Sequence, residues 1–286
     1  MNYSNISDLL ALRVADAPDK TFLISEADGR EWGYSAFREA IGKTAGLLVS
    51  RGVLKGDVVS LLLPNSAEYV IAYFACWQIG AVAGPVNSLL KAEEIEWVVN
   101  NSEAKLMLTS AEWFEKVPER LRTADAFVSF DDVHVAAGEC RANMEPPDIN
   151  ADDEAIIIYT SGTTGKPKGC LLTHGNVLAN ARQIAKWMGF GPQDRLLTVM
   201  PLFHMNAVSV TTMAALYAGG STVVAPKFSA SRFWETIEKY QVTSFGSVAT
   251  MLSILLSEPA TGAASIPAFR SLRFAMCGSA PVPPQV

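Results

Sequence analysis

Residues 155–169 read AIIIYTSGTTGKPKG, and this stretch decides the expected fold. It opens with a run of isoleucines at residues 156–158, which is typical of a strand buried on both faces. The part that follows, residues 160–169, consists almost entirely of glycine, hydroxylic residues and lysine. The order predicts a buried strand that runs directly into a small polar loop.

The loop at residues 160–169 has the composition of a polyphosphate site. Glycines let backbone N–H groups approach a ligand, hydroxyl groups donate hydrogen bonds, and a lysine neutralises charge. It is not a Walker A loop, because proline follows Lys166 where Ser or Thr is required. A surface loop in which Gly, Ser and Thr merely avoid regular structure is the other interpretation of such a run.

Apolar runs rich in β-branched residues alternate with amphipathic stretches along the chain. We predict strands at residues 58–63, 81–86, 105–109, 126–130, 155–159, 195–200, 221–225, 244–247 and 272–277. We predict helices at residues 35–51, 66–80, 90–102, 210–218 and 230–240, and a surface connection at residues 139–153. This alternation is typical of βαβ units, so we expect an α/β fold with largely parallel sheets.

Composition excludes several classes of function. The formal net charge of −6 argues against a broad basic face, so we expect no nucleic-acid partner. The four cysteines lie far apart without metal-ligand spacing and are interpreted as reduced thiols of an intracellular protein. The first twenty residues are polar and acidic rather than basic and then apolar, so no signal peptide is indicated and we expect a cytoplasmic protein.

Residues 69–86 (YVIAYFACWQIGAVAGPV) approach the length of a membrane span. They contain Gln78, two glycines and Pro85, which a span of this length would not favour. We therefore predict a buried helix that runs into a strand, and no membrane span.

The order YTSGTTGKPKG at residues 159–169 resembles the signature phosphate loop of the adenylate-forming superfamily, which contains acyl- and aryl-CoA synthetases, amino-acid adenylation domains and luciferases. The resemblance implies that ATP is bound here, that Thr163 also lies near Mg²⁺, and that Lys166 is solvated. The residues it places at the ATP phosphates are Thr160, Ser161, Gly162, Thr163, Thr164, Gly165 and Lys168.

Residues 198–210 (TVMPLFHMNAVSV) resemble the second motif of that superfamily. On this match His204 lies beside the acyl-adenylate, and the residues bordering the carboxylate-substrate tunnel are Asn206, Val208 and Val210. A lone histidine in an apolar segment is by itself more often a packed core residue. Adenylation needs positioning and charge stabilisation more than proton removal, so His204 and Lys168 are expected to act in those two ways.

Three further segments complete the resemblance. In VVAPKF (residues 223–228), Lys227 stands where CoA synthetases present a lysine to the CoA nucleotide, although a solvated lysine after a strand is an equal alternative. FGSVA (residues 245–249) corresponds to the acyl pocket and assigns Gly246 and Ser247 to the substrate. FAMCGSAP (residues 274–281) resembles the turn that lines the adenine and acyl sites, with contacts from Gly278, Ser279, Ala280 and Pro281.

Histidine and tryptophan residues outside these motifs are given structural roles. His174 is expected at the start of a helix that Thr173 or Asn176 caps. His134 is expected at the surface. Three tryptophans lie at helical spacings among apolar neighbours and are expected in the core: Trp77, Trp97 and Trp187.

The resemblance covers essentially the whole chain and implies two interleaved α/β subdomains with helices on both faces of mixed, largely parallel sheets. The first would span about residues 56–195 with the phosphate loop, and the second about residues 15–55 with 196–286. Superfamily members continue with a Gly-x-Thr-Glu motif, a ribose-binding Asp and a lid domain with the adenylation lysine. We therefore expect residues 1–286 to be an incomplete AMP-binding domain with little activity alone, and with an exposed apolar edge that favours a homodimer.

The implied activity is that of an acyl-CoA synthetase of fatty-acid-type metabolism: a small carboxylic acid, ATP and Mg²⁺ give acyl-AMP, and coenzyme A then gives acyl-CoA. Residues 197–204 and 228–252 most resemble ligases of the crotonobetaine/carnitine type. Carnitine itself is not expected, because no acidic residue in 205–212 would face a trimethylammonium group. The alternatives are an adenylation domain that loads a carrier protein, and a non-catalytic nucleotide-binding module.

Overall fold

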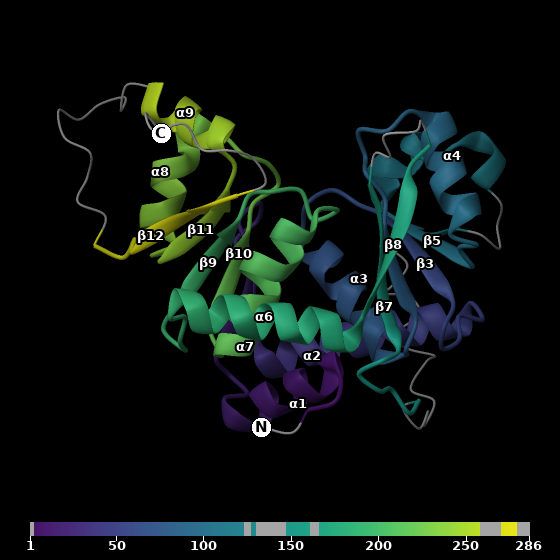
Figure 1. Cartoon of the computed structure of the whole chain (residues 1–286), viewed down its shortest axis with the longest axis horizontal. Coiled ribbons are helices and arrows are strands. Elements are labelled where there is room, and N and C mark those ends of the chain that lie inside the picture. Colours follow the sequence, from purple (N-terminus) through teal and green to yellow (C-terminus); the bar gives the residue numbers. More distant parts are fainter. Residues whose placement is uncertain (1–2, 123–126, 130–146, 161–165, 258–269, 279–286) are drawn as a thin grey trace. The chain divides into compact units, whose positions relative to one another are not determined.

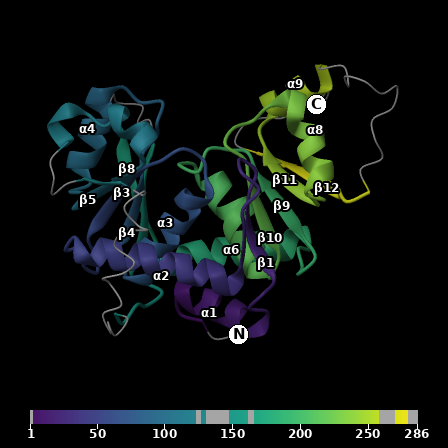
Figure 2. The same cartoon turned by 180° about the vertical axis from the view of Figure 1, so that it is seen from behind.

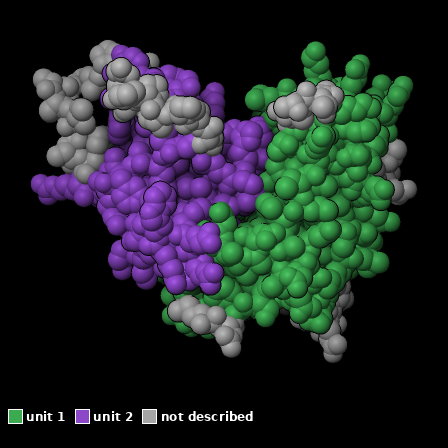
Figure 3. Space-filling view, viewed as in Figure 1, with its two compact units in different colours: residues 1–20, 33–180 green, residues 21–32, 181–286 purple. Residues whose placement is uncertain are grey.

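The computed structural model describes residues 3–122, 127–129, 147–160, 166–257 and 270–278. Contacts divide the chain into two compact units, shown in green and purple in Figure 3. Unit 1 holds residues 1–20 and 33–180, and unit 2 holds residues 21–32 and 181–286. By contacts, residues 33–55 therefore belong to unit 1 rather than to unit 2. Of the first 55 residues, only residues 21–32 belong to unit 2. The subdomain ranges expected from the sequence remain a proposal.

Unit 1 is built on a six-stranded sheet (Figure 1). Its strand order is β6 (Phe127–Ser129), β5 (Leu106–Thr109), β3 (Val58–Leu62), β4 (Val82–Pro85), β7 (Glu154–Thr160) and β8 (Lys168–Thr173). All neighbouring strands are parallel except β7 and β8, which are antiparallel. The candidate phosphate loop therefore joins the last two strands of the sheet.

Helices lie on both faces of this sheet (Figures 1 and 2). The unit contains α1 (Ile6–Asp16), α2 (Tyr34–Ser50), α3 (Ala67–Gln78) and α4 (Ala92–Asn101), with 3-10 turns at Ala111–Lys116 and Glu119–Leu121. Helix α3 packs against β3 and β4, and α1 and α2 pack against α3. Helix α3 is buried on every side, and the indole N–H of Trp77 donates to the Ala155 carbonyl at 2.8 Å. The predicted buried helix running into a strand is confirmed as α3 followed by β4, and no helix among the described residues is long and apolar enough to cross a membrane.

Unit 2 contains the second six-stranded sheet, in the order β12 (Phe274–Cys277), β11 (Ser244–Ser247), β9 (Arg195–Thr198), β10 (Ser221–Val224), β1 (Thr21–Ser25) and β2 (Glu31–Gly33). The pairs from β12 to β1 are parallel. Its helices are α7 (Ala214–Ala218), α8 (Ala230–Lys239) and α9 (Ala249–Ser257), preceded by a π-helical segment at Asn206–Met213. The predicted α/β class with largely parallel sheets is confirmed in both units.

Helix α6 (His174–Met188) follows β8 and carries the chain from unit 1 into unit 2. Its buried apolar positions are Val177, Leu178, Ala181 and Ala185. The expectation of a core position for Trp187 is wrong, because its side chain is 82% exposed. At 100° per residue, Trp187 lies off the stripe that those four residues form.

Candidate functional site

The candidate phosphate loop connects β7 to β8 in unit 1. Thr160 is the last residue of β7 and Lys168 the first of β8, and the two are register partners. Both are exposed, so these two predicted phosphate contacts stand together at the base of the loop. The remaining predicted contacts lie outside the described residues: Ser161, Gly162, Thr163, Thr164 and Gly165.

Gly169 lets the two strands carry large side chains on one face at this base. It pairs with Tyr159. A Cβ at Gly169 would lie 3.0 Å from the Ile157 Cδ1 atom and 3.2 Å from the Tyr159 Cζ atom. The glycine therefore makes room for Ile157 and for the Tyr159 ring.

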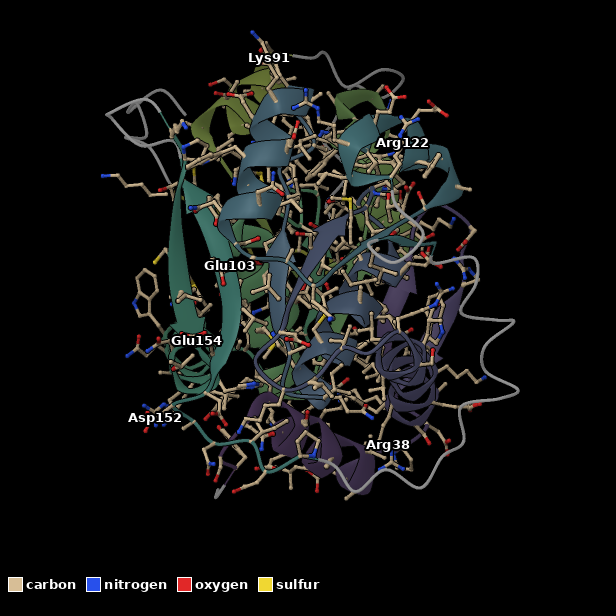
Figure 4. The ribbon with its side chains drawn as sticks, turned by 90° about the vertical axis from the view of Figure 1, so that its right-hand side faces the viewer. Arg38, Lys91, Glu103, Arg122, Asp152 and Glu154 are labelled. Atoms are coloured by element: carbon tan, nitrogen blue, oxygen red, sulfur yellow. The ribbon has the colours of Figure 1, made fainter. Side chains whose placement is uncertain are left out.

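The Tyr159 ring ends in a hydroxyl that donates to the Asn101 Oδ1 atom of α4 at 2.8 Å. Partial burial raises the pKa of this phenol above its usual range. Figure 4 shows the hairpin beside α4, which begins after Lys91 and ends before Glu103. One helix thus contacts the strand that leads into the loop.

The two residues before β8 are contacted by the same helix. The Trp97 indole N–H donates to the Pro167 carbonyl at 3.4 Å, and the Lys166 Nζ atom lies 3.8 Å from the Trp97 ring centroid. Lys166 is exposed, as expected, but its ammonium group rests on an aromatic face rather than in free solvent.

The far end of β8 is fixed by a buried histidine. The expected helix cap is confirmed, because Thr173 and Asn176 exchange side-chain-to-backbone hydrogen bonds of 3.1 and 3.2 Å. His174 is fully buried, and its Nδ1 atom accepts from the Ile6 N–H at 3.4 Å. Burial lowers the pKa of His174 to about 4, opposed by the nearby Asp153 carboxylate.

In unit 2, His204 lies at the surface just after β9 and just before the π-helical segment. Its ring centroid is 4.4 Å from that of Phe203, and partial burial lowers the pKa of its imidazole. It is thus exposed rather than packed into the core. A π-helical segment immediately after it is typical of functional positions in helices.

The predicted substrate residues of unit 2 gather at the carboxyl ends of its central strands. A Cβ at Gly246 would lie only 2.7 Å from the Asn206 Oδ1 atom and 3.3 Å from the Thr211 Cγ2 atom. The Asn206 Oδ1 atom is buried without a hydrogen-bond partner. Strand β11 thus meets the π-helical segment here, at the edge where open α/β sheets bind ligands.

The other residues expected to contact the substrate or adenine at this edge differ in how far they are buried. Ser247 is fully buried and its hydroxyl donates to the Met276 carbonyl at 2.8 Å, and the Gly278 N–H donates to the Ser247 carbonyl at 3.3 Å. Val208 is buried, whereas Val210 is half-buried. Three of the predicted turn residues lie outside the described residues: Ser279, Ala280 and Pro281.

Lys227 lines a pocket beside α8. The pocket also holds Arg232, which forms an ion pair of 3.6 Å with Glu26. Because Glu26 also lines the pocket, its lining holds two cationic side chains and one carboxylate, a net positive charge that suits an anionic ligand. Within the described ranges no group of three His, Cys, Asp or Glu side chains gathers as a metal site, and Thr163 lies outside them.

Sequence reasoning missed the contacts of Trp97 and Asn101 with the hairpin. Both residues lie in a helix that the pattern predicts, but nothing in their own segment points to a partner some 60 to 70 positions away. A tryptophan and an asparagine four residues apart on a helix are too ordinary to be singled out. The only signal is their amphipathic character at the edge of an apolar stripe.

Curated proteins that are similar to this chain in sequence include two CoA ligases. A sulfoacetate–CoA ligase of Cupriavidus necator is 32% identical over 99% of this chain and 56% of its own length. A crotonobetaine/carnitine–CoA ligase of Salmonella heidelberg is 33% identical over 85% of this chain and 50% of its own length. The chain thus spans about half the length of the curated relatives it matches.

Solved structures match the fold over nearly the whole chain. The inhibitor-bound N-terminal domain of FACL13 from Mycobacterium tuberculosis superposes with a TM-score of 0.87 at 26% identity, over 99% of this chain and 72% of that one. The o-succinylbenzoate–CoA synthetase of Bacillus subtilis in complex with AMP superposes with a TM-score of 0.83 at 30% identity, over 98% of this chain and 68% of that one. Residues 10–286 match the family described as AMP-binding enzyme, and the chain belongs to this family.

Proposed function

We propose that this chain is the nucleotide- and acid-binding part of an ATP-dependent carboxylate–CoA ligase. In the first step a carboxylate oxygen attacks the α-phosphorus of ATP, forming the acyl–AMP bond while the bond to the pyrophosphate oxygen breaks. In the second step the CoA sulfur attacks the acyl carbon, AMP leaves, and the thiol proton passes to solvent. Membership of a family whose matched relatives are CoA ligases supports this reaction class.

The observation that carries the proposal is the pairing of Thr160 with Lys168 at the base of the loop. An exposed ammonium group beside a hydroxyl, at the mouth of a glycine- and hydroxyl-rich loop, matches the needs of a triphosphate accompanied by Mg²⁺. Because the developing charge in adenylation lies on phosphate oxygens, such groups act by binding and by charge stabilisation. The five loop residues 161–165 complete the proposed phosphate contacts.

Unit 2 would supply the acid and CoA contacts. We place the acyl group of a small carboxylic acid beside Asn206, Gly246 and the half-buried Val210, with His204 beside the acyl-phosphate group. Lys227 is proposed to meet the CoA nucleotide, since the lining of its pocket carries a net positive charge. Lys227→Ala is expected to weaken CoA binding and leave ATP binding unchanged.

Calorimetric titration tests the binding step. We expect Mg-ATP to bind, and an acylsulfamoyl adenosine, which imitates acyl-AMP, to bind more tightly than adenosine. Lys168→Ala should weaken ATP binding about tenfold, because it removes a charge-assisted contact with phosphate. Lys105→Ala, at another exposed lysine of unit 1, is the matched control. Adenosine bound as tightly as acylsulfamoyl adenosine would reject the adenylate-forming site.

A screen of carboxylic acids tests the reaction itself. Pyrophosphate release that depends on the acid, followed by formation of the CoA thioester, would establish a ligase and name its acid. Thioester formed on a carrier protein instead of CoA would establish the adenylation-domain alternative. Residues 1–286 alone are expected to release little pyrophosphate, so the screen uses a protein that carries this chain within the full length of its relatives. ATP binding by that protein without any release of pyrophosphate would favour a nucleotide-binding module.

A further inference from the structure

Helix α4 presents two polar side chains to the base of the candidate phosphate loop. Trp97 and Asn101 are four residues apart, so they lie one turn above the other on one side of the helix. Asn101 accepts the Tyr159 hydroxyl at 2.8 Å, just before the loop begins. Trp97 contacts Lys166 and Pro167, where the loop ends.

Ordinary packing accounts for only part of these contacts. Trp97 and Tyr159 both pack against an apolar cluster made of α4 and the sheet: Leu62, Val86, Ile95, Val98, Val99, Met107 and Val117. Burying two aromatic rings there stabilises the unit in any event. The packing does not require the indole N–H to meet a carbonyl, nor the phenol to meet the exposed Asn101. These polar contacts fix the orientation of the two rings, and they thereby fix the positions of the residues on either side of the loop.

The contact with Lys166 adds a charge to this arrangement. Its ammonium nitrogen is 3.8 Å from the centroid of the Trp97 ring. In the described parts of the chain no carboxylate lies within ion-pair distance of it. An aromatic face attracts a cation through its quadrupole without cancelling its charge. Lys166 is therefore held in place with its full positive charge, two positions from Lys168 at the mouth of the loop.

We propose that Trp97 and Asn101 are positioning residues for polyphosphate binding. They hold the two ends of the loop at a fixed separation and keep Lys166 beside Lys168 as a second cation for the triphosphate. Neither residue touches the ligand. The inference rests on the proposed function, because it assumes that the loop binds the phosphates of ATP. It predicts that the helix beside the loop, and not only the loop, sets the affinity for polyphosphate.

The test is calorimetric titration of the chain and its variants with Mg-ATP, tripolyphosphate and AMP. Asn101→Ala should weaken ATP and tripolyphosphate binding about fivefold, the effect of one lost neutral hydrogen bond. Trp97→Phe keeps a ring under Lys166 but removes the N–H, and should weaken both about threefold. AMP binding should not change, because AMP lacks the β- and γ-phosphates.

Two controls separate positioning from general stability. Asn100→Ala changes the exposed neighbour of Asn101 in α4. Trp113→Phe changes another ring of the same cluster that carries a lysine, Lys116 at 3.7 Å, away from the loop. Both should leave ATP binding unchanged. If both controls weaken ATP binding as much as the test variants do, the effect is one of stability and the proposal fails.

A double-mutant cycle tests the Asn101–Tyr159 contact. Tyr159→Phe alone should weaken ATP binding as Asn101→Ala does, and the double variant should be no weaker than either. Wild-type binding of ATP with unchanged affinity in Asn101→Ala and Trp97→Phe overturns this inference and leaves the proposed function standing. A wild-type chain that binds neither ATP nor tripolyphosphate overturns both. Binding of tripolyphosphate but not ATP, with both variants weakened, supports the inference and rejects the proposed function.

Discussion

The β7–β8 hairpin of unit 1 and the strand ends of unit 2 carry their candidate site residues in opposite ways. Strand β8 ends its sheet, so its main chain pairs on one side only, with β7, and four of its six residues are exposed. The central strands β9, β10 and β11 of unit 2 are paired on both sides and almost wholly buried. Side-chain contacts from helix α4 add to this one-sided pairing at the base of the loop, whereas pairing on both sides holds the candidate substrate edge of unit 2.

The strand starts of unit 2 are tied by one buried carboxylate. Asp194 precedes β9 and accepts from the Gly191 N–H at 2.8 Å, from the Thr243 hydroxyl at 2.8 Å, and from Arg273 at 2.8 and 2.9 Å. Thr243 precedes β11 and Arg273 precedes β12. Burial alone would raise the pKa of Asp194, but these donors outweigh it and lower that pKa. One carboxylate thus aligns three parallel strands.

The largest effect is expected from Asp194→Ala. The change removes the acceptor that three donors share, of which Thr243 and Arg273 keep only longer contacts of 3.3 and 3.4 Å with backbone carbonyls, and it should lower the free energy of unfolding by about 3 kcal/mol. Chemical denaturation followed by tryptophan fluorescence measures it. Glu235→Ala, at an exposed carboxylate of α8, should change stability by less than about 0.5 kcal/mol. Equal stability of the two variants would show that the strands of unit 2 do not depend on this carboxylate.

The second effect is a pH dependence that belongs to unit 1. The pKa of His174 is about 4 in the folded chain against an ordinary 6.5, so the unfolded chain binds the proton first as pH falls. Stability from this residue is complete above pH 6.5 and is lost as pH falls toward 4, by at most about 3 kcal/mol. The groups that face the ring are Asp153, Lys55 and Asp8.

Unfolding at pH 7 and pH 4.5 measures this loss. His174→Asn retains an acceptor for the Ile6 N–H but cannot titrate, so it should show a smaller loss of stability between the two pH values than the unchanged chain. The carboxylates titrate in both proteins and cancel in the difference. An identical loss in the two proteins would mean that protonation of His174 is not linked to unfolding.

The sequence correctly predicts the strands in which a run of apolar residues is also buried in the structure. Ile156 and Ile157 of β7 and most of the apolar runs of β3, β9 and β10 are buried, and all four strands lie where the pattern places them. Strand β8 was not predicted, because its first residues, Lys168 and Gly169, end a run that is typical of a loop and become extended by pairing with β7. Strand β1 was also missed, since its parallel partner β10 lies some 200 residues away.

The candidate site divides in the same way. Motif resemblance brings Asn206 and Gly246 together, and the structure places them in contact distance of each other. It also identifies Thr160 and Lys168, which the hairpin pairs. The resemblance is silent on how the loop is held, because Trp97 and Asn101 belong to no motif. Contacts between distant segments depend on sheet order, which a periodicity does not reveal.

The third effect tests the packed edge of unit 2. Gly246→Ala would place a methyl group 2.7 Å from the Asn206 Oδ1 atom and 3.3 Å from Thr211, in a strand that is buried throughout. The Asn206 carboxamide must move, and we expect a loss of about 2 kcal/mol from overpacking. Denaturation measures the stability. If the variant keeps its stability but prefers a different acid in the ligase assay, the carboxyl end of β11 can adjust to the methyl group, which contradicts this prediction.

The smallest effect should come from the corresponding glycine of the hairpin. Gly169→Ala places a methyl group 3.0 Å from Ile157 and 3.2 Å from Tyr159, but on an exposed edge strand that can shift. The loss of stability should be about 1 kcal/mol or less, since alanine also reduces the entropy of the unfolded chain. The loss in the free energy of ATP binding should be larger than the loss in the free energy of unfolding, because the Tyr159 ring is displaced from Asn101. Gly42→Ala in α2 is the control: its methyl group meets no atom within 4 Å and should stabilise the chain by about 0.5 to 1 kcal/mol. If Gly169→Ala lowers the free energy of unfolding more than Gly246→Ala does, the hairpin is the less adjustable of the two regions and the contrast drawn here is wrong.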